Sequence, residues 1–300
     1  MPAVRHPPAI AFIVGVLGIA LFSGMDAVMK GLVLAIGTIT TMFWRNLIGI
    51  GLSGLLYLPR RRGWPSLSTM KIHLARGILS TAMGFLFFWG LARVPLAQAI
   101  ALAFIAPLIA LYLASLLLKE TIGGKTVAAS LVAFAGVVVI FVGQAQADLG
   151  RDALIGSVAI LISAVLYALN IIIMRQQALV ADPLEITFFQ SVIVTIALLA
   201  LLPFVGIAVP PAATWPALLL AAVLAITSML LLSWAYARAE ASYLAATEYT
   251  AFLWAALFGW MFFDERVSPF TLAGAALIVA GCILAARRPE EASPTLEAAT

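Results

Sequence analysis

The sequence predicts an all-α integral membrane protein whose ten transmembrane helices form two inverted five-helix repeats. Three observations support this prediction: the composition, the length of the apolar stretches and an internal duplication. Hydrophobic residues make up 64% of the 300 residues, charged residues only 10%, and the mean hydropathy is +1.13. Because a soluble domain carries about 25% charged residues, this composition excludes an ordinary soluble fold.

Apolar stretches of roughly the 20 residues needed to span a bilayer as a helix recur along the whole chain. They are continuous and rich in Leu and Ala, without the alternation of a membrane barrel strand, so helices are favoured. The ten predicted helices comprise residues 9–29, 38–58, 71–91, 95–118, 124–142, 153–174, 183–203, 213–236, 241–263 and 268–286.

The first apolar stretch is predicted to be a helix of the folded protein. It is longer than the core of a secretory signal and ends in Asp26 and Lys30 without a small-residue cleavage pattern. Near the other end, Cys282 is the one cysteine, so a disulfide within the chain is excluded and no metal site is expected. Residues 289–300 are polar and predict a short disordered tail.

The chain contains two copies of one unit. Trp89-Gly-Leu-Ala-Arg93 reappears 145 positions later as Trp234-Ala-Tyr-Ala-Arg238. The repeats are predicted as residues 1–145, with helices 1–5, and 146–288, with helices 6–10. Because five is odd, the second copy enters the membrane from the opposite side, and inverted halves can alternate between inward-open and outward-open shapes. The same offset aligns Phe104 with Tyr249, Glu120 with Glu265 and Gly136 with Gly281.

Basic residues near the helix ends predict the orientation, because short cytoplasmic loops retain Lys and Arg. With the N-terminus inside, twelve fall on the cytoplasmic side and four on the outer side. We therefore expect a multi-pass protein of the cell (inner) membrane with both termini in the cytoplasm. The net charge of +4 follows from this topology, and no nucleic acid partner is expected. The twelve are Arg5, Arg60, Arg61, Arg62, Lys71, Arg76, Lys119, Lys125, Arg175, Arg238, Arg287 and Arg288; the four are Lys30, Arg93, Arg151 and Arg266.

Both halves carry a glutamate before a helix with spaced glycines. The first copy reads Leu118-Lys-Glu120 with Gly136 later, and the second reads Phe263-Asp-Glu265 followed by Gly274-Ala-Ala-Leu-Ile-Val-Ala-Gly281. This pattern resembles the EamA-type branch of the drug/metabolite transporter (DMT) superfamily, over the whole chain except the tail. The first copy departs from it in having Ala129 where the second has Gly274. Within the superfamily the chain most resembles bacterial exporters of amino acids and related metabolites, including aromatic amino acid exporters of the YddG type.

The resemblance implies a basket of helices 1–4 and 6–9 around a central cavity, with helices 5 and 10 packed outside as supports. The glycine spacing agrees with this arrangement. Gly136 and Gly143 in helix 5, like Gly274 and Gly281 in helix 10, are seven residues apart, and we expect them to let a neighbouring helix approach closely.

Glu120 and Glu265 are the acids that mark the family. Each lies at the end of a helix, where the helix dipole disfavours negative charge. We expect them to shape the turn into the supporting helix, with a gating or folding role as the alternative. After the second acid, Ser268-Pro269 predicts an N-cap followed by proline at the first helical position.

Ionisable residues deep in a span are functional candidates, because burying charge in hydrocarbon is costly. Glu248 lies about two turns into helix 9, and its repeat partner is Ala103. Its carboxylate suits an ammonium group or takes up a proton. The alternative is that it snorkels to the cytoplasmic edge and pairs with Arg238.

Two further groups are assigned to the outer side. Asp26 and Lys30, one turn apart on helix 1, are expected to form a local pair. Arg45 is a candidate for closing an outer gate, with snorkelling to the surface as the alternative.

Uncharged polar and aromatic side chains supply the rest of the candidate cavity. Ser163, Tyr167 and Asn170 have i, i+4, i+7 spacing and form one polar stripe on helix 6. A mostly apolar cavity with few hydrogen-bonding points suits hydrophobic or aromatic amino acids better than phosphorylated sugars. The candidate substrate-binding residues are Ser80, Met83, Phe87, Ser163, Tyr167, Asn170, Ser228, Glu248 and Tyr249.

The predicted function is export of hydrophobic or aromatic amino acids by a secondary transporter, with the bilayer and a small-molecule substrate as partners and a proton as the candidate coupling ion. Other metabolites or drugs, a lipid-linked substrate flipped between leaflets, and a membrane-embedded enzyme are the alternatives. Gly123-Gly-Lys-Thr126 imitates the end of a P-loop, but Lys119 stands where the first glycine is required. With His6 and His73 as the only histidines and no nucleophile–base pair visible, neither catalysis nor a cofactor is expected.

Overall fold

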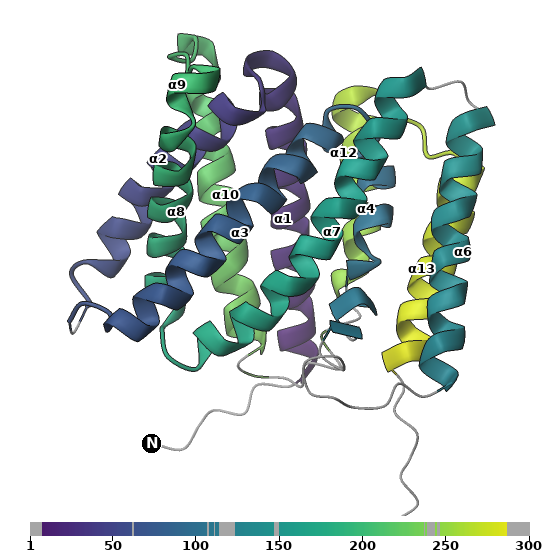
Figure 1. Ribbon diagram of the computed structural model, residues 1–300, viewed down its shortest axis with the longest axis horizontal. Coiled ribbons are helices and arrows are strands. Elements are labelled where there is room, and N and C mark those ends of the chain that lie inside the picture. Colours follow the sequence, from purple (N-terminus) through teal and green to yellow (C-terminus); the bar gives the residue numbers. More distant parts are fainter. Residues whose placement is uncertain are drawn as a thin grey trace, which may run out of the picture.

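The second half of the molecule runs through the bundle in the opposite sense to the first. The computed structural model describes residues 8–61, 63–106, 108–110, 112–113, 124–146, 150–236, 238, 244 and 247–286, which contain helices and no strand. The predicted all-α fold is thereby confirmed. Helix α1 (Pro8–Ile36) begins and α13 (Pro269–Ala286) ends at one end of the bundle, whereas α7 (Gly150–Ala178) begins at the other (Figure 1).

A helix occupies each of the ten predicted segments. Five helices are long and apolar enough to cross a membrane by length and composition, counted over the described ranges. Helix α3 begins earlier than predicted, because the Ser66 hydroxyl caps it by accepting from Thr69 N at 3.2 Å. Besides α1, α7 and α13, the elements are α2 (Thr38–Tyr57), α3 (Leu67–Leu91), α4 (Leu96–Ala103), α6 (Gly124–Gln146), α8 (Pro183–Ala200), α9 (Leu202–Val205), the 3-10 turn η1 (Ala212–Thr214), α10 (Trp215–Tyr236) and α12 (Thr250–Phe263).

Helices α6 and α13 form a pair beside the rest of the bundle, as expected for supports (Figure 1). They approach so closely that a Cβ added to Gly136 would lie 2.6 Å from the Gly274 carbonyl oxygen, and a Cβ on Gly274 would lie 2.6 Å from the Gly136 oxygen. A Cβ on Gly143 would overlap Phe270 at 2.2 Å. The predicted close approach at these glycines is therefore confirmed.

Two helix crossings use the same repeat positions in opposite roles. Where α10 crosses α1, the Ser228 hydroxyl donates to the Gly18 carbonyl at 2.8 Å. Where α7 crosses α3, the Ser163 hydroxyl donates to the Met83 carbonyl at 2.9 Å. Gly18 is the repeat partner of Ser163, and Met83 that of Ser228. Both hydroxyls therefore join helices at these crossings, and their predicted place in the substrate cavity stays a prediction.

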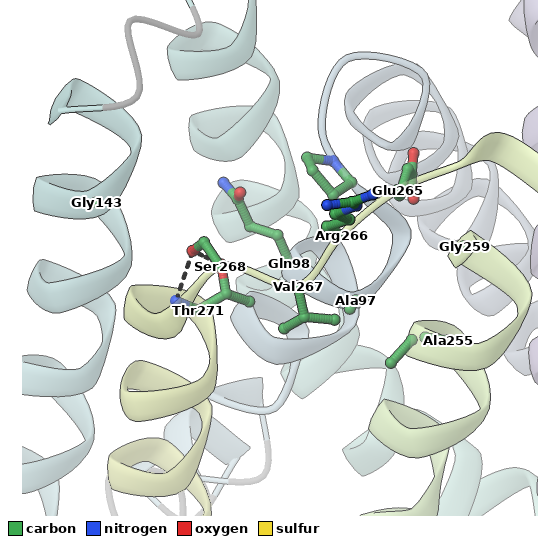
Figure 2. A pocket seen from close by; sticks show the side chains of 12 residues that line it. Ala97, Gln98, Gly143, Ala255, Gly259, Glu265, Arg266, Val267, Ser268 and Thr271 are labelled. Carbon is green, nitrogen blue, oxygen red and sulfur yellow. Dashed lines mark hydrogen bonds between the residues drawn. The ribbon is translucent and has the colours of Figure 1, made fainter.

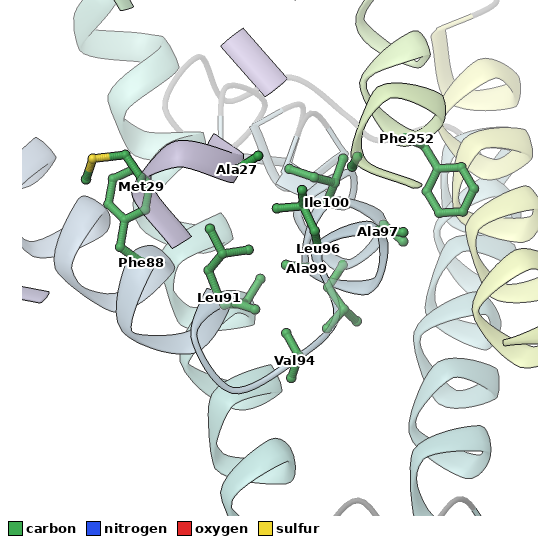
Figure 3. Packing of buried hydrophobic residues seen from close by; sticks show 14 of the residues in the cluster. Ala27, Met29, Phe88, Leu91, Val94, Leu96, Ala97, Ala99, Ile100 and Phe252 are labelled. Carbon is green, nitrogen blue, oxygen red and sulfur yellow. The ribbon is translucent and has the colours of Figure 1, made fainter. Parts of the chain in front are cut away.

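Buried apolar side chains join the first four helices to the second half. Figure 3 shows Met29, Leu91 and Ile100 of the first half and Phe252 of the second, and these side chains belong to one buried cluster. Large apolar side chains also cover much of the surface, among them Phe134, Leu253 and Trp260, each more than 60% exposed. A surface of this kind is stable in lipid and not in water.

Glu265 joins three helices at the outer end, which we define as the end opposite the start of α1. Its carboxylate forms an ion pair with Lys30 of α1 and accepts from the backbone N–H of Leu96, the first residue of α4, at 2.7 Å. The positive end of the α4 dipole therefore stabilises this charge. Lys30 also donates to the Val94 carbonyl at 2.6 Å. The predicted local pair between Lys30 and Asp26 is wrong, because Lys30 reaches across the bundle instead.

The segment between α12 and α13 is shaped to present Glu265. Asp264 ends α12 in the left-handed conformation, with φ 52°, and the Glu265 N–H bonds back to the Gly259 carbonyl at 3.1 Å. A Cβ on Gly259 would lie 2.8 Å from a Glu265 carboxylate oxygen. At the start of α13, the predicted N-cap is confirmed: Ser268 accepts from Thr271 N at 3.0 Å (Figure 2).

The approach of α6 to α13 predicts that Gly136→Ala destabilises the protein. Its Cβ would meet backbone atoms that cannot rotate away, and overpacking costs about 1–3 kcal/mol. We expect a lower melting temperature in detergent. Gly51→Ala is the matched control, since nothing lies within 4 Å of its Cβ position. Equal melting temperatures for the two variants would contradict the packing described.

The ion pair at the outer end predicts non-additive effects. Glu265→Gln leaves the Lys30 ammonium buried without its counter-ion, a loss on the order of 3 kcal/mol. The double variant Lys30→Met, Glu265→Gln removes both charges, so it should be more stable than the sum of the single losses predicts. Thermal unfolding of the three variants measures this coupling, and strict additivity would argue against it.

Candidate functional site

The fourth and ninth predicted helices are interrupted at the same position of their repeats. A turn at Phe104 and Ile105 follows α4, and a turn at Tyr249 precedes α12. The 145-residue offset relates Phe104 to Tyr249, and their rings meet edge to face with centroids 5.5 Å apart. Residues that are both repeat partners and neighbours lie near the axis relating the halves. In transporters built from inverted repeats, interrupted helices at this interface form the substrate site.

Backbone groups freed by an interruption need new partners. In sequence, Pro107 follows the first interruption and has no N–H to offer to the carbonyl four residues before it. The Phe104 carbonyl accepts a hydrogen bond from the Cys282 thiol of α13, with an Sγ to O distance of 3.2 Å. The supporting helix thereby stabilises the interrupted one.

Glu248 lies at the second interruption, beside Tyr249. Its carboxylate accepts from the Tyr236 hydroxyl of α10 at 2.7 Å, and its side chain is exposed. The alternative partner Arg238 is engaged elsewhere: its guanidinium covers the Trp234 ring at 4.2 Å and donates to the Trp234 carbonyl. The structure therefore gives Glu248 a tyrosine partner and leaves its carboxylate accessible.

Arg76 lies inside the bundle, which corrects the prediction that this residue belongs to the cytoplasmic surface. It lies about 13 Å along α3 from Leu67 and is only 6% exposed. Its Nε donates to Asn170 Oδ1 at 3.2 Å and its Nη1 to Gln177 Oε1 at 2.5 Å. Over the described ranges, no carboxylate lies within 4 Å of this guanidinium. The available signal was a charged residue inside the predicted helix 71–91.

A chain of hydrogen bonds extends from Arg76 to the inner end of the bundle, defined as the end where α1 begins. Gln177 Nε2 donates to His73 Nδ1 at 2.6 Å, so the imidazole proton is on Nε2, which lies 3.1 Å from Glu185 Oε1. Tyr57 donates to the same carboxylate at 3.3 Å. Glu185 also borders an inner-end cavity of about 550 Å³. The chain fixes Gln177 and so orients the guanidinium.

Tyr167 of α7 lies within electrostatic range of both charged groups. It interacts electrostatically with Arg76 and with Glu248. Its side chain is 41% exposed, which leaves its ring free to contact a ligand. A guanidinium recognises a carboxylate, whereas a carboxylate and aromatic rings recognise an ammonium group. The arrangement can therefore bind a molecule that carries both charges and an apolar body.

Some of the predicted site residues lie beside Arg76, and others lie elsewhere in the bundle. Asn170 Oδ1 accepts from Arg76 and, at 3.4 Å, from Ser80, so both predicted polar residues meet the guanidinium. Met83 and Phe87 lie farther along α3 and are partly buried. Tyr249 contacts Phe104 at the interruption.

The predicted gating residues are also separated. Glu265 belongs to the outer junction with Lys30, and Glu120 lies outside the described residues. Asp26 and Arg45 interact electrostatically between α1 and α2. In the residues that the structure describes, no group of three or more His, Cys, Asp or Glu could hold a metal ion.

Comparison with known proteins supplies a family. The model of the EamA-like transporter family matches the chain twice, at residues 9–142 and 154–287. The pseudopaline exporter CntI of Pseudomonas aeruginosa is 27% identical over 92% of this chain and 95% of its own length. The riboflavin transporter of Rhizobium johnstonii is 31% identical over 90% of this chain and 88% of its own. A protein of known crystal structure shares the fold, with a TM-score of 0.61 and 21% identity over 93% of this chain and 98% of that one.

The position of Glu248 predicts that Glu248→Gln reduces transport without affecting expression or folding. The substitution keeps the shape of the side chain and its acceptor for Tyr236 while removing the charge offered to a cationic group. We expect at least an about tenfold loss of exchange, as for one charge-assisted contact. Transport kinetics and pH response equal to those of the unmodified protein would remove Glu248 from the mechanism.

Proposed function

The chain belongs to the EamA-like transporter family, and on this basis we propose that it exports amino acids with hydrophobic or aromatic side chains by alternating access. Membership makes it a multi-pass membrane transporter. The proposal adds the substrate class and the direction, and it rests chiefly on one observation: Arg76 is a buried cation whose hydrogen-bond partners, among the residues that the structure describes, are neutral side chains.

The substrate class follows from the chemistry of the cluster. Arg76 uses Nε and Nη1 to bond side-chain amides, and its Nη2 donates to no residue in the described ranges. A planar guanidinium with a free nitrogen suits a carboxylate, and bringing in that carboxylate neutralises the buried charge. Glu248 then receives the ammonium group. The exposed ring of Tyr167 provides a face for the apolar part of the substrate.

The direction follows from where the cluster lies. Arg76, Gln177 and Tyr236 all belong to the inner-end portions of their helices, which the basic residues predict to face the cytoplasm. At the outer end, the ion pair of Lys30 with Glu265 ties α1 to α4. A site in the inner half of the bundle, with helices tied together at the outer end, suits loading from the cytoplasm.

The relatives support export of a small organic molecule. One is named as an exporter and another as a riboflavin transporter, and neither name concerns a free amino acid. Export of another metabolite or a drug is therefore the second candidate, favoured by these names. Both candidates require the same site, since a charged or polar solute needs Arg76 or Glu248 as a partner.

Counterflow in liposomes tests the substrate class. Purified protein is reconstituted, and the exchange of labelled amino acids, nucleosides, sugars and cationic drugs is measured. We expect aromatic and large aliphatic amino acids to exchange fastest. Amines lacking the carboxylate should exchange at least about tenfold more slowly, because they leave Arg76 unpaired. Exchange of a lipid analogue between leaflets without solute counterflow would instead indicate a flippase.

Substitutions at Arg76 assign the carboxylate contact. Arg76→Gln should abolish amino acid counterflow, and Arg76→Lys should retain only part of it, because an ammonium lacks the planar fork. Lys71→Gln is the matched control, since it removes an exposed positive charge from the same helix. Equal losses for amino acids and for their decarboxylated analogues would argue against the proposed contact, because only the former offer a carboxylate.

A further inference from the structure

Three buried polar atoms in the outer half of the bundle have no hydrogen-bond partner among the described residues. They are the Ser23 hydroxyl and one carboxylate oxygen of Asp26 on α1, and the Thr41 hydroxyl on α2. Their residues are 1%, 2% and 0% exposed. Buried polar groups are almost always bonded, because leaving one unpaired in a low-dielectric interior costs free energy. Three such atoms on two adjacent helices therefore indicate a site for a small ligand.

The sequence spacing brings these atoms toward one another. Ser23 and Asp26 are three residues apart on α1, and Thr41 and Arg45 are four apart on α2, so each pair shares a helix face. Asp26 and Arg45 interact electrostatically but form no ion pair within 4 Å. The Arg45 Nη1 lies 3.6 Å from Met25 Sδ. Arg45 therefore reaches α1 at the residue next to Asp26, and the carboxylate has an arginine near it without a direct bond.

Arg45 is the one charged group that faces Asp26 from the described parts of the neighbouring elements. Helices α10 and α12, which pack on α1, contain no Asp, Glu, Lys, Arg or His, and the one tyrosine between them, Tyr236, is at the inner end. The charged and titratable residues of α3, Lys71, His73 and Arg76, lie in its inner half. On α1 itself, Lys30 is one turn away and is engaged by Glu265.

A proton fits this site better than a metal ion does. A metal cation requires several oxygen ligands, and the positive charge of Arg45 opposes it. A proton needs only the carboxylate, and binding it converts a costly buried anion into a neutral acid. The protonated acid also gains an O–H donor.

The duplication argues that this cluster does more than hold the fold together. The repeat partners of Ser23, Asp26 and Arg45 are Ala168, Ile171 and Gln190, so the second copy has no equivalent cluster. The second copy folds without this cluster. The cluster is therefore a candidate for a function that the transporter performs once in each transport cycle.

We propose that Asp26 binds the proton that this transporter exchanges for its substrate, with Arg45 as the counter-ion of the deprotonated carboxylate. A proton entering from the outer side neutralises Asp26 and weakens its attraction to Arg45. When the protein opens inward, the carboxylate releases the proton and the attraction returns. The inference rests on the proposed function, and it makes the transporter an antiporter. Asp26 then acts on transport through the conformational equilibrium, because the cluster at Arg76 and Glu248 lies toward the other end.

The first test separates coupling from substrate recognition. Proteoliposomes are loaded with a substrate that the unmodified protein exchanges, and its gradient-driven movement is measured with and without a pH difference. We expect an inward proton gradient to drive export in the unmodified protein. In Asp26→Asn, gradient-driven export should fall at least about tenfold while counterflow changes less than about threefold. Asp152→Asn, which removes an exposed carboxylate at the start of α7, should retain both activities.

A second measurement does not depend on the substrate or on transport. Infrared difference spectra of the purified protein, recorded as the pH is lowered, should show the carbonyl band of a protonated carboxylic acid. The band should be absent in Asp26→Asn and shifted in Asp26→Glu. If no amino acid exchanges but this band is present, the proposed substrate is wrong and the proton site stands.

Two results would overturn the proton site. One is an Asp26→Asn variant whose export responds to the pH difference as the unmodified protein does. The other is an infrared titration that is unchanged by both substitutions at Asp26. If Asp26→Asn does not fold, the export and infrared measurements on Asp26→Glu test the proton site instead. This variant keeps a titratable group, and the altered position of that group must shift the pH profile of export.

Discussion

A polar group inside a lipid bilayer has no water to bond with, so its partner must come from the protein. This constraint explains how the helices of this transporter are joined. Ser163 and Ser228 each donate to a carbonyl of the helix they cross. Lys30 reaches Glu265, which is 235 positions away in sequence. Because each of these bonds connects different helices, satisfying the polar groups also determines which helices lie side by side.

The duplication separates scaffold from function. The two helix crossings use the same pair of repeat positions with their roles exchanged, and at the interruptions Phe104 contacts its own repeat partner Tyr249. The charged groups behave differently. Glu248 corresponds to Ala103 and Arg76 to Ala221, so each charge belongs to one copy only. The contact between the interruptions therefore follows the duplication, whereas the charges of the proposed site do not.

The candidate site was predictable in part. Helical spacing alone placed Asn170 and Tyr167 on one face of helix 6, and in the structure Asn170 accepts from Arg76. Arg76 was not recognised, because a basic residue near the end of an apolar segment is normally cytoplasmic. The spacing also grouped Ser163 with the stripe, although its hydroxyl is used at a crossing. Helical periodicity gives the direction of a side chain but does not identify the helix that it meets.

The sequence by itself determined the membrane class, the ten helical segments and the inverted duplication. These follow from the length and composition of local stretches and from a fixed offset, which need no knowledge of contacts. Only the tertiary structure decided that Lys30 pairs with Glu265 rather than Asp26, and that Arg76 lies inside the bundle. The physical reason is that a charge in an apolar bundle takes whichever partner the crossing helices bring within reach, and those crossings depend on packing between residues far apart in the chain.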